Sequence, residues 1–404
     1  MKFYNLKEND EQVSFAGAVK QGLGRNQGLF FPEHIPSFDN IKELLALPLV
    51  ERSVKVLYPF VSDDLTQQQL TEIVTDAFNF PAQIQPISEK RAILELFHGP
   101  TLAFKDFGAR FMAKCLQAFS QGKKITILTA TSGDTGAAVA HAFHDIDNID
   151  VVILYPKGKI SLLQEKMFTT LGGNIKTVAI EGTFDDCQAL VKQSFDDQEL
   201  KETIGLNSAN SINIARLIPQ SFYYLYAYAQ LKKINKKPLA ICVPSGNFGN
   251  LTAGLIAKKM GLPIKKLIAA TNANDPFPIF LQTGHFKPKE SVKTLSNAMD
   301  VGNPSNFVRI LELYKFNLEN IRKEIESKSY NDEETLETIR ELYQNSNYIL
   351  EPHGAIGYMG IKDFVKNHNK YYRNQQNGRG FVDKSKEFRR ILVFIFIKFF
   401  KTNK

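Results

Sequence analysis

Cysteine is scarce in this chain of 404 residues, and long apolar runs are missing. The three cysteines, Cys115, Cys187 and Cys242, form neither a disulfide framework nor a metal-ligand spacing, and they suit a reducing compartment. No run approaches the ~18 apolar residues that a membrane span requires. The first residues also lack the apolar segment of a signal peptide. We therefore expect a cytoplasmic protein with no membrane partner.

The excess of positive charge is confined to the end of the chain. The net charge is +8, but residues 361–404 hold 12 Lys and Arg against 3 Asp and Glu, whereas residues 1–360 hold 38 against 39. A protein that binds nucleic acid usually has a basic surface. The balanced composition of residues 1–360 therefore argues against a nucleic-acid partner.

Metal-ligand spacing is absent among the histidines. His98, His141 and His353 stand apart from one another, and we expect a hydrogen-bonded structural role for each. The segment Glu351–Ala355 is typical of a tight functional loop. No metal site is expected.

Strands that alternate with helices form the main pattern that is present. Short apolar runs, typical of buried strands, occur at 125–128, 151–155, 175–180, 239–243 and 267–270. Continuous apolar strands that alternate with helical patterns predict an α/β fold with parallel sheets covered on both faces. A tyrosine cluster at 223–228 predicts a half-buried helix.

The pattern divides the chain into three parts. Residues 1–91 are expected to form a small N-terminal domain with helices at 41–45 and 65–78, the first ended by Pro48. Pro81 and Pro86 mark a linker. Residues 92–360 are expected to form the α/β core. Residues 361–404 are an atypical tail, basic until Arg390 and then apolar, which is an aggregation liability unless it packs somewhere.

A lysine between aromatic residues is the most unusual local feature. Lys105 stands between Phe104 and Phe107, after a Gly-Pro turn. Either its stem packs while the ammonium stays in water, or the amine is desolvated so that its pKa falls and it can form a Schiff base. Taken alone, the stretch favours the first explanation.

Two glycine-containing loops each join a predicted strand to a predicted helix. The loop 245–250 lacks the Walker lysine and the dinucleotide glycine spacing, and it predicts either a cradle for one phosphate group or a plain turn. The loop 131–136 suits a carboxylate, unless Ser132 or Asp134 simply caps the helix. The polar segment 207–216 places Arg216 within reach of a further anion. With Lys105, these loops are typical of pyridoxal phosphate chemistry.

Five segments resemble bacterial threonine synthases, and they occur in the family's order. They are Leu94–Gly108, Thr129–Ala138, Asn207–Asn213, Val243–Asn250 and Thr294–Val301, and the resemblance extends from Met1 to about Asp363. It implies a fold-type II pyridoxal phosphate enzyme with two open parallel-sheet α/β subdomains and a small N-terminal domain. It also implies an enzyme that converts O-phospho-L-homoserine and water to L-threonine and phosphate by γ-elimination and β-addition. We expect a monomer or homodimer.

The resemblance implies a role for individual residues, carried over by position. Lys105 would be the catalytic Schiff-base lysine. The implied cofactor-binding residues are Lys105, Asp134, Ser245, Gly246, Asn247, Phe248, Gly249 and Asn250. The implied substrate-binding residues are Thr131, Ser132, Gly133, Thr135, Ser208, Asn210, Asn213 and Arg216.

The end of the chain departs from the family. After Glu351–Ala355 the resemblance implies a strand and a Thr-Ala-His-Pro-Ala-Lys-Phe motif, whose hydroxyl lies near the pyridine nitrogen, and neither is recognised after Lys362. Residues 379–404 instead resemble a translation out of frame, so we expect a frameshift. Two alternatives therefore stay open, a catalytically impaired remnant that lacks this contact with the cofactor ring, and a serine or threonine ammonia-lyase.

Overall fold

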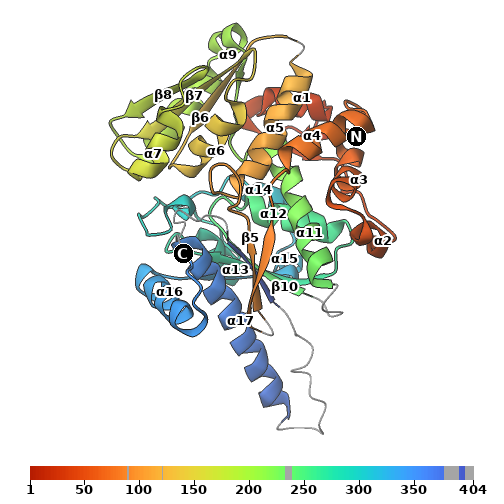
Figure 1. The fold of residues 1–404 in the computed structure, drawn as a ribbon, viewed down its shortest axis with the longest axis vertical. Helices are drawn as coiled ribbons and strands as arrows, with labels where there is room; N and C mark the ends of the chain where they lie inside the picture. The colour runs from red at the N-terminus through yellow and green to blue at the C-terminus, as the bar shows by residue number, and fades with distance from the viewer. Residues whose placement is uncertain (89–90, 121, 233–238, 377–390, 396–404) are drawn as a thin grey trace. The chain divides into compact units, whose positions relative to one another are not determined.

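The computed structural model describes residues 1–88, 91–120, 122–232, 239–376 and 391–395 (Figure 1). The chain forms two compact units, and each is assembled from two stretches of sequence. The first unit contains Met1–Pro81 and His98–Phe222, and the second contains Ala82–Phe97 and Tyr223–Lys404.

The N-terminal part of the first unit has a three-stranded antiparallel sheet and four helices. Its strands are β1 (Phe3–Asn5), β2 (Gln12–Val13) and β3 (Phe30–Pro32), in the order β2-β1-β3. Its helices are α1 (Phe15–Gln21), α2 (Ile41–Ala46), α3 (Leu49–Val61) and α4 (Gln67–Ala77). The helices expected at 41–45 and 65–78 are confirmed. Pro48 separates two helices, because it also precedes α3, which the sequence pattern missed.

A four-stranded parallel sheet forms the rest of the first unit. Its order is β8-β7-β6-β9, with β6 at Ile125–Ala130, β7 at Ile149–Pro156, β8 at Ile175–Ile180 and β9 at Leu206–Asn207. Its helices are α5 (Lys105–Phe119), α6 (Asp134–Phe143), α7 (Leu162–Thr169), α8 (Phe184–Asp196), α9 (Gln198–Ile204) and α10 (Ile214–Leu217). Leu128 and Leu154 pack with Val191 of α8, whereas Ile153 faces Gly136 of α6. Both faces are therefore covered, as the apolar strands predicted.

A six-stranded sheet forms the centre of the second unit. Its order is β12-β11-β10-β13-β5-β4, and all neighbours are parallel except β4 and β5. The strands are β4 (Gln83–Ser88), β5 (Arg91–Glu95), β10 (Leu239–Pro244), β11 (Ile264–Thr271), β12 (Ile325–Ser329) and β13 (Ile391–Ile395). The linker expected at Pro86 is wrong, because this residue lies in β4. β4 is an edge strand, where proline is tolerated because one side of the strand needs no hydrogen-bond donor.

The expectation that no strand follows Lys362 is also wrong. Ile391–Ile395 forms β13, which pairs with β10 on one side and with β5 on the other. An apolar run can occupy such an interior position because both rows of its backbone groups find partners there. The frameshift proposed for the tail stays a prediction.

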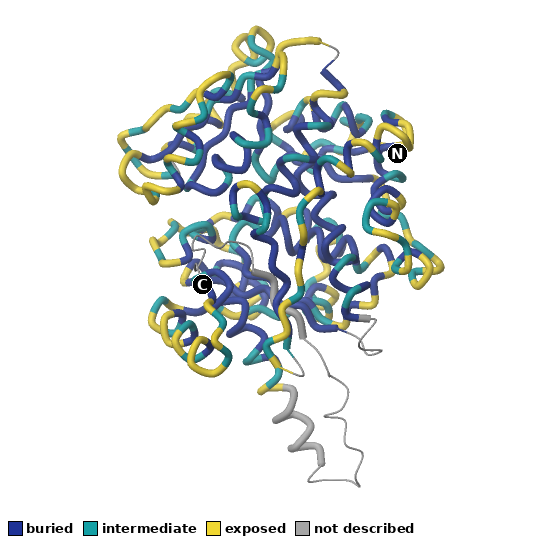
Figure 2. Tube along the Cα trace, viewed as in Figure 1, coloured by how far each residue is buried: buried dark blue, intermediate teal, exposed yellow. Residues whose placement is uncertain are grey.

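Helices cover the six-stranded sheet. They are α11 (Ser221–Lys232), α12 (Gly249–Lys259), α13 (Pro276–Thr283), α14 (Phe307–Leu313), α15 (Leu318–Glu324), α16 (Asp332–Ser346) and α17 (Pro352–Gln376). Gly360 of α17 lies against Cys242 and Ile268 of the sheet. The half-buried helix expected at 223–228 is wrong in degree, because Tyr223, Tyr224 and Tyr228 are each at most 2% exposed. Buried backbone runs through the interior of each unit (Figure 2).

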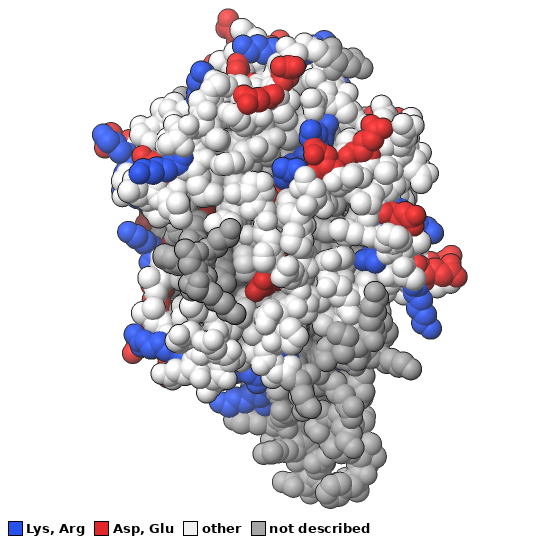
Figure 3. All heavy atoms as spheres, in the orientation of Figure 1, with Lys and Arg blue, Asp and Glu red and all other residues white. Residues whose placement is uncertain are grey.

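The described surface carries charges of both signs. On the face drawn in Figure 3, Lys and Arg side chains lie among Asp and Glu side chains. Within the described parts of the chain, no helix has the length and apolar character needed to cross a membrane. The same residues contain no group of three or more His, Cys, Asp or Glu side chains arranged to hold a metal ion.

Candidate active site

Lys105 is the first residue of α5 and its amine is largely withdrawn from water. The side chain is 14% exposed, and Nζ lies 3.5 Å from Oδ2 of Asp134. Burial lowers the pKa of Lys105, the carboxylate of Asp134 opposes this shift, and the positive charge of Arg216 adds to it. The desolvated explanation for this lysine therefore fits the structure better than the solvated one.

The aromatic neighbours of Lys105 anchor the start of α5. Phe107 is buried in a cluster where its ring lies 4.3 Å from that of Phe80 and 5.0 Å from that of Phe222. Phe78 stacks on Phe222 at 4.1 Å. Because Phe107 is held by packing, the helix turn that begins at Lys105 has a fixed position.

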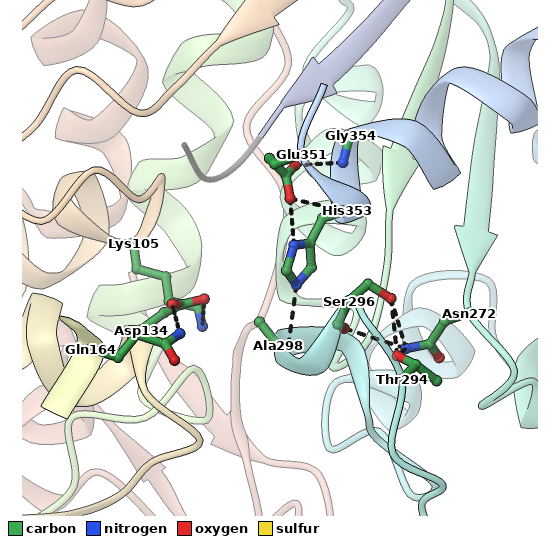
Figure 4. Close-up of polar contacts among 10 residues, drawn as sticks. All are labelled: Lys105, Asp134, Gln164, Asn272, Thr294, Ser296, Ala298, Glu351, His353 and Gly354. Atoms are coloured by element: carbon green, nitrogen blue, oxygen red, sulfur yellow. Dashed lines mark hydrogen bonds and ion pairs between the residues drawn. The ribbon is translucent and has the colours of Figure 1, made fainter. Parts of the chain in front are cut away.

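Asp134 begins α6 and is 2% exposed. Gln164 of α7 donates a hydrogen bond of 2.7 Å to Oδ1 of Asp134, as Figure 4 shows, whereas Oδ2 accepts none and faces the Lys105 amine. Gly133 has a φ of +128°, and a Cβ there would lie 2.6 Å from Nε2 of Gln164. Glycine is therefore required where the loop passes this side chain. Sequence reasoning missed Gln164, since its spacing from Ser161 signals only a helix cap.

The remainder of the 131–136 loop is held by its own hydroxyl. Thr131 Oγ1 accepts hydrogen bonds from the backbone N–H groups of Gly133 at 2.9 Å and Gly136 at 2.8 Å. The Thr131 hydroxyl thus shapes the loop, whereas Ser132 and Thr135 are only partly buried. Their roles toward a substrate stay predictions.

The segment 207–216 contributes one buried cation near Lys105. Arg216 is 3% exposed and donates to the carbonyl oxygen of Ala209. A Cβ on Gly108 would lie 2.9 Å from the Arg216 carbonyl oxygen, so α5 passes this arginine closely. The small residue therefore allows the approach that brings the two positive charges near each other.

The two asparagine side chains at positions 210 and 213 differ in how many of their polar atoms are already hydrogen-bonded. Asn213 donates to the carbonyl oxygen of Val19 at 3.0 Å and accepts from the N–H of Ala215 at 3.0 Å, so its amide supports the fold. The hydroxyl of Ser208 accepts from the N–H of Asn210 at 3.3 Å. Oδ1 of Asn210 is buried and accepts no hydrogen bond, which leaves an acceptor for a ligand.

The loop 245–250 belongs to the second unit and leads into α12. Phe248 holds a left-handed backbone conformation, with φ +60°, and packs against Phe277 at 4.5 Å. No side chain caps the helix start, so the first N–H groups of α12 keep their hydrogen-bonding capacity for an anion. A Cβ on Gly246 would lie 2.7 Å from Cα of Met299, so the loop lies directly against the segment 294–301.

Side chains outside the loop hold its two asparagines. Oδ1 of Asn247 accepts from the N–H of Ser305 at 2.5 Å, and its carbonyl oxygen accepts from Nδ2 of Asn306 at 3.1 Å. Asn250 Nδ2 donates to the hydroxyl of Tyr223 at 2.6 Å, and the hydroxyl of Tyr224 donates to both oxygens of Asn250. Sequence reasoning missed both sets of supports. The tyrosine cluster is the available signal, but its pattern predicts only a half-buried helix.

The segment 294–301 is itself tied to the fold by buried polar groups. The N–H of Ala298 donates to Nε2 of His353 at 3.2 Å, and Nδ1 of His353 lies 2.6 Å from Oε2 of Glu351 (Figure 4). Asn272 donates to Thr294 Oγ1 at 2.8 Å. The structural role expected for His353 is therefore confirmed, and Glu351 also accepts from the first N–H groups of α17.

Each unit contains a group of residues that suits pyridoxal phosphate chemistry. In the first unit, a desolvated lysine accompanies a carboxylate oxygen that accepts no hydrogen bond. In the second, an uncapped helix start follows a loop of fixed conformation, which suits one phosphate group. The fold and these residues define a pyridoxal phosphate-dependent enzyme, and the family model described as "Pyridoxal-phosphate dependent enzyme" matches residues 92–371.

Comparison with known proteins narrows this class. The model described as "Threonine synthase N terminus" matches residues 2–78. The threonine synthase of Haemophilus influenzae is 59% identical over 91% of this chain and 86% of its own length, and that of Escherichia coli is 57% identical over 90% and 85%. The chain belongs to the threonine synthase family.

Solved structures agree. The crystal structure of threonine synthase from Escherichia coli has a TM-score of 0.89 at 52% identity, covering 98% of this chain and 88% of that one. The threonine synthase of Brucella melitensis, solved with pyridoxal phosphate bound, has a TM-score of 0.87 at 32% identity, with coverage of 98% and 89%. The fold-type II architecture and the cofactor expected from the sequence are confirmed.

A pH prediction arises from Asp106, which follows Lys105. Asp106 is 1% exposed and accepts hydrogen bonds from the N–H of Thr101 at 2.9 Å and its hydroxyl at 2.6 Å. Burial raises its pKa from 3.8 to about 6, against the effect of these bonds. The folded state therefore binds a proton more tightly than the unfolded state, so this carboxyl's contribution to stability is present at low pH and is lost as pH rises toward 6.

Replacing Asp106 with asparagine should remove that dependence. The contribution of Asp106 to the free energy of unfolding should fall by ~1 kcal/mol between pH 5 and pH 7. Urea unfolding of both proteins at several pH values measures the difference, which cancels the titration of all other groups. Parallel curves for the two proteins would contradict the assignment.

A second prediction concerns Tyr224. Replacing it with phenylalanine removes the hydroxyl that fixes Asn250, so the dissociation constant of pyridoxal phosphate should rise about fivefold, equivalent to one hydrogen bond of ~1 kcal/mol. Fluorescence titration of cofactor-free protein measures it. Tyr226→Phe is the matched control on the same helix, because Tyr226 is partly exposed. Equal affinities for the two variants would contradict a role for Tyr224.

Proposed function

We propose that this threonine synthase converts O-phospho-L-homoserine and water to L-threonine and phosphate. The observation that carries the proposal is the Lys105 amine, which is held 3.5 Å from Asp134 and has a pKa lowered by burial and by Arg216. An amine whose pKa is lowered gives up and takes back a proton more readily than a solvated lysine does.

We assign the following roles in catalysis and cofactor binding to residues of this chain. Lys105 binds the cofactor and, when substrate replaces it, moves the proton at the substrate α-carbon. Asp134 would interact with the ring hydroxyl of the bound cofactor, and the loop Ser245–Asn250 would hold its phosphate. The cofactor, when bound, supplies an electron sink for the carbanion. Loss of a β-proton would accompany cleavage of the bond between the γ-carbon and the phosphate oxygen; a proton would then add at the γ-carbon, water at the β-carbon and a proton at the α-carbon.

The substrate-binding groups come from the first unit. We assign the substrate carboxylate to the loop 131–136, through Thr131, Ser132, Gly133 and Thr135. The substrate phosphate is assigned to Ser208, Asn210 and Arg216, whereas the Asn213 amide, which is bonded to Val19 and Ala215, holds the segment in place. The buried guanidinium of Arg216 and the unused Oδ1 of Asn210 support a polar ligand at this segment, and the charge of Arg216 suits a phosphate.

The two alternatives that the sequence left open, an ammonia-lyase and an impaired remnant, are not favoured. A threonine deaminase from Solanum lycopersicum shares the fold at 17% identity and a TM-score of 0.57, which is a likeness of fold alone. Identity above 50% to several threonine synthases, over about nine-tenths of this chain, favours the family's own reaction over an ammonia-lyase or an impaired remnant.

We also propose a cytoplasmic monomer or homodimer. All three cysteines are buried and free, which supports a reducing environment. The division into an N-terminal domain (1–91), a catalytic core (92–360) and a divergent tail (361–404) remains our proposal for the arrangement along the sequence.

Two assays with the full-length, cofactor-loaded protein test the function. We expect phosphate release from O-phospho-L-homoserine in step with threonine formation, and only slow 2-oxobutanoate release from L-threonine. Faster release of the oxo acid would instead establish the ammonia-lyase. Cofactor binding without turnover of either substrate would establish the remnant.

A further inference from the structure

A buried arginine is connected through hydrogen bonds to the loop that we assign to the cofactor phosphate. Arg309 lies in α14 and is fully buried. Burial lowers its pKa to about 9, so the guanidinium stays charged at neutral pH. Keeping a cation inside a protein is costly, and such groups are usually retained for a specific interaction.

Hydrogen bonds connect this arginine to the loop. Nη1 of Arg309 donates to Oδ1 of Asn306 at 2.7 Å, and Nδ2 of Asn306 donates to the carbonyl oxygen of Asn247 at 3.1 Å. Because the amide oxygen of Asn306 accepts from a charged donor, its NH₂ group becomes a better donor to Asn247. Both Asn306 and Arg309 are 0% exposed, so solvent does not weaken either bond.

Aromatic packing fixes the two ends of this connection. Phe307 precedes Arg309 by two residues, and its ring lies 5.8 Å from that of Phe277. Phe277 in turn packs on Phe248 of the loop at 4.5 Å. The N–H of Ser305, beside Asn306, also donates to Oδ1 of Asn247 at 2.5 Å. The start of α14 and the loop therefore form one packed body within the second unit.

We propose that Arg309 is a positioning residue for the cofactor phosphate, acting through Asn306 on the backbone of Asn247. It fixes the loop conformation and supplies a positive charge behind it, which favours a dianion over a neutral ligand. This inference rests on the proposed role of the loop in holding the phosphate.

Comparing pyridoxal phosphate with pyridoxal tests the inference, because only the first carries the phosphate. In Arg309→Met the dissociation constant of pyridoxal phosphate should rise at least tenfold, whereas that of pyridoxal should change less than threefold. Arg309→Lys, which keeps the charge but loses the planar fork, should give an intermediate loss. The ³¹P resonance of the bound phosphate should shift in both variants.

Further variants separate the outcomes. Asn306→Ala should reproduce the phosphate-specific loss and should not add to that of Arg309→Met, because both act along one connection. If Arg309→Met fails to fold, Asn306→Ala tests the inference in its place. Arg322→Met is the matched control and should leave both affinities unchanged, since the described hydrogen bonds of the Arg322 side chain, in the same unit, go to Leu281, Gln282 and Glu319.

Two results would overturn the inference in different ways. Equal weakening of pyridoxal and pyridoxal phosphate by Arg309→Met, Arg309→Lys and Asn306→Ala would mean that Arg309 has only a structural role. If the unmodified protein bound pyridoxal as tightly as pyridoxal phosphate, the assignment of the loop itself would fail.

Discussion

Replacing Lys105 with alanine is expected to abolish turnover and the visible absorbance band that the cofactor gains when this lysine holds it. The loss of rate should be about 10³-fold or more, because the same amine anchors the cofactor and moves protons. No neighbouring group in the described contacts can replace it, since the nearest ionisable partners are the Asp134 carboxylate and the Arg216 guanidinium.

Lys114→Ala provides the control for this experiment. Lys114 lies on the same helix, is 38% exposed and pairs with Asp76 at 2.8 Å. This variant should keep both the absorbance and the turnover. An alanine variant at Lys105 that kept either property would remove this residue from the centre of the site.

Replacing Val393 with proline is expected to unfold the second unit. β13 pairs with β10 and with β5, so a proline there removes a backbone donor and inserts its ring into the interior of the sheet. The free energy of unfolding should fall by about 1–3 kcal/mol for the backbone hydrogen bond that is lost, and further for the distortion caused by the ring. Circular dichroism during urea unfolding, together with cofactor binding, measures the effect.

Val393→Ala is the matched variant, because it shortens the side chain and keeps the backbone N–H. It should keep the sheet and bind the cofactor. If the proline and alanine variants unfolded at the same urea concentration as the original protein, β13 would contribute nothing to the sheet.

Residues 391–395 join the six-stranded sheet through backbone pairing with β10 and β5, although their sequence does not resemble the family motif. The similarity to the Haemophilus influenzae threonine synthase covers 91% of the chain, whereas the structural match to the Escherichia coli enzyme covers 98%. A parallel strand needs an apolar, β-prone run and two neighbours, and not a particular motif. The run 391–395 therefore takes an interior position in the sheet, although its sequence departs from the family pattern.

Much of the fold could be predicted because its signals are local. The strands at β6, β7, β8, β10 and β11 are continuous apolar runs, and the helices α2 and α4 have clear helical spacing. The predictions were wrong or incomplete where the same residue type is compatible with two local structures. Proline at 48 separates two helices, and proline at 86 is compatible with an edge strand as well as with a linker.

The sequence by itself determined the class of cofactor and the identity of the lysine and loop proposed to bind it, because these signals are motifs of adjacent residues. Only the tertiary structure decided that Lys105 is desolvated, since burial is the main cause of its lowered pKa, and Asp134 and Arg216, which modify the shift, are distant along the chain. It also supplied Gln164, Tyr224 and the connection from Arg309 to Asn247. Burial and hydrogen bonding between distant residues exist only after folding, so no local pattern could have specified them.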